Sequence, residues 1–261
     1  MNISLTNKQA IICGASQGIG RATAIQFANL GASTLLLARN EEKLQEIIRD
    51  LPQKDAQQHH YLVVDLSQPQ QTLECVNKFL KDKPIHILVN NCGGPKPGSL
   101  IDAHLDDFDN AFTPHLKASH LLVQSLHKRM AAENYGRVIN IISTSVKQPI
   151  RGLGVSNTTR GAMASWAKTL AAELGPLNIT VNNVLPGYTA TERLQSIIAN
   201  KATKNNSSTD EVTATMKKQV PLGRFATATE VANAIAFLAS PAASYINGIS
   251  LAVDGGRTES L

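Results

Sequence analysis

The 261-residue sequence has few of the features that mark secreted, membrane-bound or metal-binding proteins. It holds only three cysteines, Cys13, Cys75 and Cys92, and their wide spacing fits neither a disulfide framework nor a metal site. No run approaches the roughly 18 apolar residues of a membrane span, and residues 1–8 lack the charged-then-apolar order of a signal peptide. We therefore expect a cytoplasmic protein with no bound metal and no membrane contact.

Aromatic residues and clustered charge are also scarce. Phe, Trp and Tyr make up 4% of the chain, and the net charge of +5 comes from scattered Lys and Arg without a basic block. Nucleic-acid binding is therefore not indicated, whereas a phosphorylated cofactor or an acidic partner is compatible with this charge. The hydrophobic fraction of 43% suffices for a well-buried core. Because no Gly/Ser/Pro linker or repeat divides the chain, we expect one domain over residues 1–261.

The most informative segment is a glycine-rich turn between an apolar run, 10–13, and a helical pattern, 21–30. Its residues are Gly14, Ala15, Ser16, Gln17, Gly18, Ile19 and Gly20. Three glycines at a strand-to-helix turn let the backbone approach a pyrophosphate, and the helix N-terminus then presents free N–H groups and its positive dipole end. The segment predicts the phosphate site of a dinucleotide; glycines that only shape a turn are the alternative.

A second apolar run, 33–38, predicts a strand whose end should lie beside the adenosine ribose. Enzymes that use NAD place a carboxylate there to accept the ribose hydroxyls. Here Ala38 occupies that position and Arg39 follows it. A guanidinium suits a 2′-phosphate, so the sequence predicts NADP(H) in preference to NAD(H). The alternative is that Arg39 is only a solvated loop residue.

The remaining elements follow a strand–helix alternation. Strands are expected at 60–64, 85–89, 137–142, 179–184 and 249–253, and helices at 68–81, 104–133, 155–175 and 229–238. Polar or glycine-rich residues follow several of these strands, where ligands bind in a doubly wound parallel sheet. The polar segment 188–220 is too long for a simple connector, and we expect it to form a lid over the substrate.

Five short motifs in this order resemble the short-chain dehydrogenase/reductase family across nearly the whole chain, and most closely its 3-oxoacyl-acyl-carrier-protein reductase-like members. They are the glycine-rich turn, Asp65-Leu66, Asn90-Asn91-Cys92-Gly93, Pro186-Gly187 and Val253-Asp254-Gly255-Gly256. The resemblance implies an α/β fold, a three-layer Rossmann-type doubly wound parallel sheet of seven strands. It also implies an oxidoreductase that acts on a carbonyl or alcohol, with a small-molecule or acyl-thioester substrate, and a homotetramer or homodimer.

The same resemblance assigns cofactor-binding roles to residues at the strand ends. Asp65 and Leu66 would hold the adenine, while Asn91 and Gly93 would border the nicotinamide-side ribose. The turn Pro186-Gly187 with Thr189 would contact the nicotinamide carboxamide.

Two further positions relate to catalysis by the same resemblance. Ser143 matches the family's catalytic serine. His115 occupies the position of a helical asparagine that takes part in a proton relay, and Pro114 before it would kink the helix or free a carbonyl. The alternative is that His115 is a structural residue.

The family's tyrosine and lysine are absent. Thirteen residues after Ser143 stands Ser156, four further stands Arg160, and no Tyr-x3-Lys occurs anywhere in the chain. A serine hydroxyl is a far weaker acid than a phenol beside an ammonium. Arg160 keeps its charge and can bind ribose hydroxyls or a carboxylate, but it does not relay a proton. The candidates for proton delivery are His115, Tyr188, Lys147 and water.

Three functions remain open from the sequence. The first is an NADP(H)-dependent oxidoreductase in which Ser143, Ser156, Arg160 and His115 form an altered catalytic site. The second is a non-catalytic dinucleotide-binding protein, either a sensor or a partner subunit. The third is nucleophilic displacement with halide release, but relatives of that kind keep the tyrosine and lose the glycine-rich turn, the reverse of this chain.

Overall fold

Seven parallel strands form one central sheet in the computed structural model, which describes residues 1–54 and 56–260. The strands are β1 (Gln9–Cys13), β2 (Ser33–Ala38), β3 (His59–Val63), β4 (Ile87–Asn90), β5 (Gly136–Ile141), β6 (Ile179–Pro186) and β7 (Ser250–Val253). Their order is β3-β2-β1-β4-β5-β6-β7, so the winding reverses between β1 and β4. The Rossmann-type sheet expected from the resemblance is confirmed, and the reversal marks where such sheets bind ligands.

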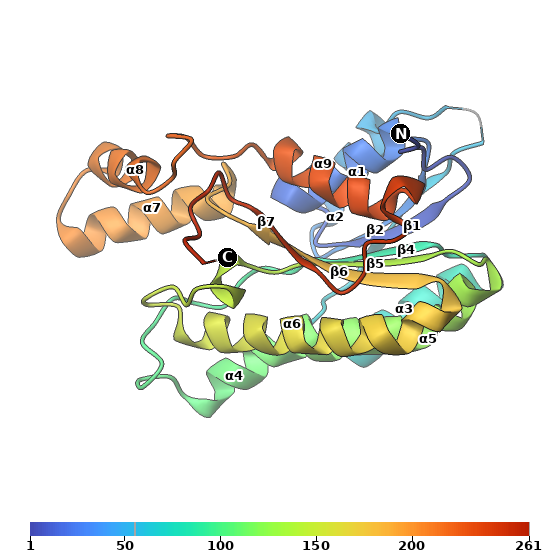
Figure 1. Ribbon diagram of the computed structural model, residues 1–261, viewed down its shortest axis with the longest axis horizontal. Coiled ribbons are helices and arrows are strands. Elements are labelled where there is room, and N and C mark those ends of the chain that lie inside the picture. The colour runs from blue at the N-terminus through green and yellow to red at the C-terminus, as the bar shows by residue number, and fades with distance from the viewer. Residues whose placement is uncertain (55, 261) are drawn as a thin grey trace.

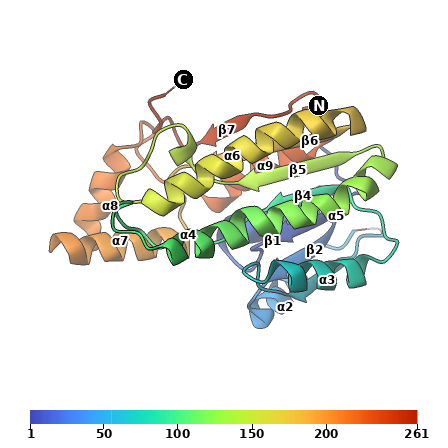
Figure 2. The same ribbon diagram turned by 90° about the horizontal axis from the view of Figure 1, so that it is seen from below.

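Helices cover both faces of the sheet (Figures 1 and 2). One face carries α1 (Gly18–Asn29), α2 (Glu41–Asp50) and α9 (Ala228–Ala239), and the other carries α3 (Pro69–Leu80), α5 (Ala118–Ala132) and α6 (Gly154–Leu174). Each face has its own apolar core, with Phe27 and Leu36 fully buried in one and Leu88 and Leu126 in the other. Because both faces are covered, the central strands β1, β2 and β4 consist mainly of buried apolar residues.

The expected helix over 104–133 is wrong in detail, because the structure divides it. It contains α4 (Leu105–Phe112), a π-helical turn (Thr113–Lys117) and α5. Pro114 has no N–H to donate to the preceding turn, which accounts for the interruption. Ser119 Oγ donates to the His115 carbonyl at 2.6 Å. The π-helical turn directs the buried His115 side chain toward Cys92, which follows the carboxyl end of β4.

The segment 188–220 forms a helical hairpin beyond the carboxyl ends of the strands, seen at the left of Figure 1. It consists of α7 (Glu192–Asn205) and α8 (Thr209–Lys218). Its buried residues form a small separate core of Leu194, Ile198, Ala202, Val212 and Met216, against which Tyr188 and Phe225 pack. This position is suited to covering a ligand at the sheet edge, and the role as a lid stays a prediction.

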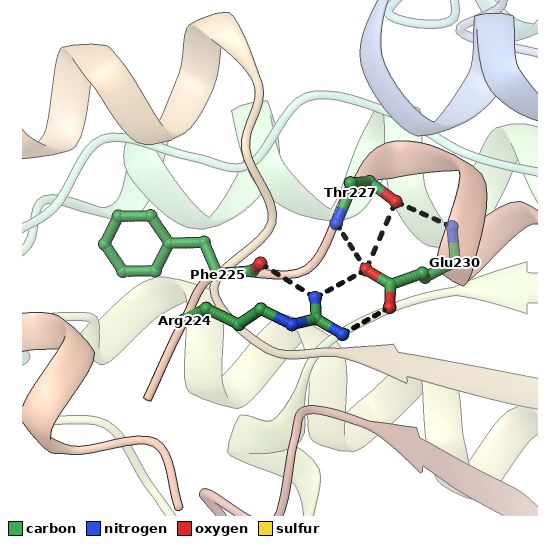
Figure 3. Close-up of polar contacts among 4 residues, drawn as sticks. All are labelled: Arg224, Phe225, Thr227 and Glu230. Carbon is green, nitrogen blue, oxygen red and sulfur yellow. Dashed lines mark hydrogen bonds and ion pairs between the residues drawn. The ribbon is translucent and has the colours of Figure 1, made fainter. Parts of the chain in front are cut away.

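An ion pair ties the end of this segment to α9 (Figure 3). Arg224 forks onto Glu230 with N···O distances of 2.8 and 2.7 Å. Thr227 caps α9, since its Oγ1 accepts from Glu230 N and its backbone N–H donates to the Glu230 carboxylate. Hydrogen bonds from Arg224 and Thr227 lower the pKa of Glu230 to about 2. These contacts therefore fix the chain that follows the helical hairpin to the N-terminus of α9.

Within the described residues, no helix has both the length and the apolar character needed to cross a bilayer. The same residues contain no group of three or more His, Cys, Asp or Glu side chains placed to hold a metal ion.

Candidate active site

The glycine-rich turn is held in a conformation that requires its glycines. Gly14 and Gly18 have φ values of +59° and +53°, which side chains rarely tolerate. A Cβ at Gly20 would overlap the Gly14 carbonyl oxygen. Asn91 Nδ2 donates to that oxygen at 3.1 Å, so the end of β4 fixes the shape of the turn after β1.

The N-terminus of α1 is left open toward this turn. Gln17 is the N-cap residue, its backbone is extended, and no side chain caps the helix. The first turn also lacks acidic residues. The N–H groups of Gly18, Ile19 and Gly20 therefore have no side-chain acceptor and face outward with the positive end of the helix dipole. These features fit a bound diphosphate, as expected for the segment Gly14 to Gly20.

A threonine that the sequence reasoning missed borders the same turn. Thr191 caps α7, accepting from Leu194 N at 3.4 Å, and its Cγ2 lies 3.2 Å from where a Cβ on Gly18 would be. The predicted Thr189 is buried, and its hydroxyl donates to Gly187 O at 3.2 Å. The helix-capping pattern of a threonine followed by Glu192 could have identified Thr191.

The predicted adenosine site lies at the ends of β2 and β3, on the other side of the turn. Arg39 is exposed and makes no hydrogen bond within the described residues. Asp65 Oδ1 accepts from Ser67 N at 2.9 Å, which leaves Oδ2 available. Leu66 is half-buried between this site and β4. The arrangement leaves a free guanidinium and a free carboxylate oxygen at neighbouring strand ends.

A ladder of three buried amides and one serine hydroxyl crosses four neighbouring strands, β4 to β7. Asn90 Nδ2 donates to Asn140 Oδ1 at 2.8 Å, and Asn140 Nδ2 donates to Asn183 Oδ1 at 3.0 Å. Asn183 Nδ2 then donates to Ser250 Oγ at 3.1 Å. The ladder fixes β4, β5 and β6 relative to one another. Asn91, Ser143 and the turn at Gly187 follow these three strands.

Ser143, which matches the family's serine, follows β5, while Ser156 and Arg160, which replace the tyrosine and lysine, lie in the first turns of α6. Ser143 caps a short 3₁₀ turn (Thr144–Val146), its Oγ accepting from Ser145 N at 3.1 Å. Ser156 and Arg160 stand one turn apart on α6 and so share a face. Arg160 Nη1 donates to Ile141 O at 3.1 Å. The Arg160 guanidinium therefore lies at the end of β5. The residue that it binds there, Ile141, is two positions before Ser143 in the sequence.

His115 and Cys92 meet beside this guanidinium. Cys92 Sγ lies 3.4 Å from His115 Nε2. Burial, together with the charge of Arg160, lowers the pKa of His115 well below its usual value, and burial raises the pKa of Cys92 to about 11. The imidazole is therefore neutral at pH 7 and the thiol is protonated. Sequence reasoning did not assign Cys92 a role, because nothing in a lone cysteine marks it for one.

A small cavity is lined by these groups. Its polar lining includes Asn90, Asn91, Cys92, His115, Ser119 and Arg160. The volume open to the centre of a water molecule is about 10 Å³, close to the least that one buried water needs. Asn90 Oδ1 and Arg160 Nε are both buried without a hydrogen-bond partner in the described structure. The cavity therefore has the room and the polar partners for one bridging water.

The other suggested proton sources are placed differently. The Tyr188 hydroxyl donates to Gln219 Oε1 at 3.0 Å, and the Arg257 guanidinium lies 4.2 Å from the centre of its ring. The phenol is thus engaged at the base of the helical hairpin. Lys147 is exposed at the end of the 3₁₀ turn. His115 and the cavity are the candidates that adjoin Arg160.

Replacing His115 should make the protein less sensitive to acid. Below its ordinary pKa of 6.5, the unfolded imidazole takes up a proton while the folded one stays neutral, so stability falls with pH by about 1.4 kcal/mol per unit for this group. We expect His115→Asn to lose roughly 1 kcal/mol less stability than wild type between pH 6.5 and 5.5. Urea unfolding at pH 5.5, 6.5 and 8.0 measures this. Parallel curves for the two proteins below pH 6.5 would contradict it.

Comparison with known proteins gives a consistent set of relatives. A family model described as "Enoyl-(Acyl carrier protein) reductase" matches residues 14–258. The 3-oxoacyl-[acyl-carrier-protein] reductase FabG of Rickettsia bellii is 34% identical over 256 residues, which cover 97% of this chain and 98% of the relative. The NADPH-dependent reductase BacG of Bacillus subtilis is 28% identical over 98% of this chain and 100% of its own.

A solved structure agrees equally well. L-sorbose reductase from Gluconobacter frateurii, in complex with NADPH and L-sorbose, superposes with a TM-score of 0.93 and 30% sequence identity over 100% of both chains. The fold of this chain is therefore shared with a reductase whose structure was solved in complex with NADPH.

Proposed function

Because the chain belongs to the short-chain dehydrogenase/reductase family, we propose that it is an NADP(H)-dependent oxidoreductase that reduces a carbonyl group or oxidises the corresponding alcohol. The family membership makes an oxidoreductase the expected class of enzyme. The choice of NADP(H), the altered proton relay and the substrate, either a small carbonyl compound or a 3-oxoacyl thioester, belong to the proposal.

The cofactor half of the site is the observation that carries this proposal. The turn from Gly14 to Gly20 keeps its left-handed glycines, its bond from Asn91 and its uncapped helix end. Such a turn costs conformational freedom and leaves helix donors unpaired, so it is retained where an anion occupies it. A bound nicotinamide would supply the hydride for the reduction.

The chain itself must then deliver a proton to the carbonyl oxygen. Ser143 can donate a hydrogen bond there, and Ser156 offers a second hydroxyl on the facing helix. The proton would be replaced from solvent by way of a water in the cavity between Arg160, His115 and Asn90. This water would donate one proton as it accepts another, so no group would be left ionised. Because His115 is neutral, it would act as a hydrogen-bond partner of this water and not as an imidazolium acid.

Loss of NADPH absorbance across a panel of ketones, hydroxyketones and 3-oxoacyl thioesters tests the reductase proposal. We expect turnover with at least one class. Absence of turnover with every compound, for protein that binds NADPH in calorimetry, would contradict it. We further propose that α7 and α8 cover the substrate. We also propose that the chain forms a homodimer or homotetramer, and sedimentation of the purified chain measures this assembly.

Arg39→Ala should weaken NADPH binding by about 10-fold while leaving NADH binding unchanged. One charge-assisted contact to a phosphate accounts for about this factor, and NADH lacks the 2′-phosphate. Calorimetric titration with both nucleotides measures the effect. Arg49→Ala, which removes a similar charge from the last turn of α2, is the control. Equal affinity of wild type for the two nucleotides would reject the preference for NADP(H).

A second candidate function rests on Ser156 and Arg160, which replace the family's tyrosine and lysine. A protein that binds the dinucleotide without catalysing a reaction would need neither the tyrosine nor the lysine. Under this alternative, wild type binds NADPH without turnover, while the double variant Ser156→Tyr/Arg160→Lys acquires reductase activity. Turnover by a homo-oligomer of the wild-type chain would reject it.

A further inference from the structure

Two guanidinium groups from distant parts of the chain approach the same point above Gly94. A Cβ built on Gly94 would lie 3.8 Å from Arg160 Nη2 and 3.7 Å from Arg193 Nη2. Apart from the chain neighbours of Gly94, no other heavy atom of the described residues lies within 4 Å of that point. The space over Gly94 is therefore open apart from the two positively charged guanidinium groups that border it.

Arg160 brings an uncompensated buried charge to this space. The residue is 6% exposed, its Nη1 donates to Ile141 O, and its Nε has no hydrogen-bond partner in the described structure. None of the ion pairs found among the described residues includes it. Burying a charge without a partner is costly, so the fold keeps this guanidinium at a cost that a bound anion would offset.

Arg193 is exposed and stands at the end of a helix that disfavours a cation. It is the second residue of α7, near the positive end of the helix dipole. Its Nη2 donates to Pro95 O at 3.0 Å, which holds the side chain over the Gly94 backbone, and it forms no ion pair within the described residues. The positive charges of Arg160 and Arg193 also repel each other. This repulsion is a further reason to expect an anion close to both.

The diphosphate of a dinucleotide is not the anion that this pair requires. It has its own site in the turn Gly14 to Gly20 and at the start of α1, which Thr191 borders. Gly94 instead follows Asn91 and Gly93, the residues that the family resemblance places at the nicotinamide end. A group held over Gly94 would therefore lie beside the position of the reacting carbonyl.

We propose that Arg160 and Arg193 together bind a carboxylate of the substrate. The two forks present several N–H donors, the geometry that suits a carboxylate. This inference rests on the proposed reductase function and narrows its substrate to an oxo acid, in preference to a neutral ketone or an acyl thioester. Because Arg193 lies on the helical hairpin and Arg160 on the body, a bound carboxylate would also join the two parts of the site.

Binding to the protein loaded with NADP⁺ tests the inference without requiring turnover. The probes are three pairs of an oxo acid and its amide: 2-oxobutanoate, acetoacetate and levulinate, with 2-oxobutanamide, acetoacetamide and levulinamide. In calorimetry, we expect at least one acid to bind wild type 10-fold or more tightly than its amide. Arg193→Gln should reduce this preference to less than about 3-fold without changing the affinity for NADP⁺.

Arg129→Gln is the matched control. Arg129 also lies on a helix and donates one hydrogen bond to a backbone carbonyl, that of Lys83, at 3.1 Å, but at the other end of the sheet. Its variant should keep the full preference for the acid. This separates a local effect of Arg193 from a general loss of positive charge.

Three outcomes would overturn the inference. No acid binding more tightly than its amide would reject the carboxylate site. An equal loss of NADP⁺ and acid affinity in Arg193→Gln would assign Arg193 to the cofactor. Failure of wild type to bind any NADP(H) would reject the proposed function and this inference together. If the acid binds and NADPH does not reduce it, the anion site stands and the reductase function fails.

Discussion

Gly20→Ala is expected to weaken NADPH binding by on the order of 100-fold, equivalent to about 3 kcal/mol, the value of one or two charge-assisted hydrogen bonds. The added methyl would overlap the Gly14 carbonyl oxygen, which belongs to backbone and cannot rotate away. Either α1 or the turn must therefore shift. A shift moves the N–H groups of Gly18 to Gly20 from the positions where they would contact the phosphates.

The effect on stability should be much smaller than the effect on affinity. Overpacking costs about 1–3 kcal/mol, whereas replacing glycine by alanine within a helix regains about 1 kcal/mol. Calorimetry with NADPH and urea unfolding of the same samples separate the two quantities.

Gly161→Ala is the control for this prediction. Gly161 also lies within a helix, α6, but it is exposed, and a Cβ there would meet no heavy atom of the described residues within 4 Å. We expect unchanged affinity and equal or greater stability. An affinity for NADPH in Gly20→Ala within a factor of 3 of wild type would contradict the proposed position of the diphosphate.

Asn140→Ala should reduce the free energy of unfolding by about 3–5 kcal/mol. Asn140 is fully buried at the centre of the amide ladder. Without its side chain, Asn90 Nδ2 loses its acceptor and Asn183 Oδ1 loses its donor, and each unpaired buried group costs about 1–3 kcal/mol. Asn90 Oδ1 has no hydrogen-bond partner in the described structure even in wild type. The loss of the bond from Asn90 Nδ2 would therefore leave the whole Asn90 amide group unpaired.

Urea unfolding at pH 7.5 measures this loss. Asn233→Ala, on the exposed face of α9, is the control and should change stability by less than about 0.5 kcal/mol. A loss below about 1 kcal/mol in Asn140→Ala would show that water replaces the missing amide. The ladder would then contribute little to holding the strands together.

Local sequence patterns were sufficient for the strands, but not for α7 and α8 or for the division of the helix expected over 104–133. The apolar runs predicted β2 at 33–38 without error and the other strands within one or two residues, because strands covered on both faces leave continuous apolar segments. The glycine spacing located the turn after β1. Pro114 was expected to kink its helix or free a carbonyl, and the structure instead places it within a π-helical turn, Thr113–Lys117.

Contacts between distant segments could not be read in the same way. The Arg160–Arg193 pair joins residues from α6 and α7 over a glycine from a third segment, and no spacing in the chain encodes that meeting. Cys92 beside His115, and Thr191 beside Gly18, are further examples. Each depends on how loops after different strands turn toward one another at the same sheet edge.

The order of motifs along the chain by itself determined the fold class, the position of the glycine-rich turn and the loss of the tyrosine and lysine, because these depend on residue type and local spacing. Only the tertiary structure decided that His115 is buried and neutral, that the amides form a continuous ladder, and that two arginines share an open space above Gly94. Burial and the distance between charges are properties of chain segments brought together by folding, and they set the pKa values and the binding chemistry of the site.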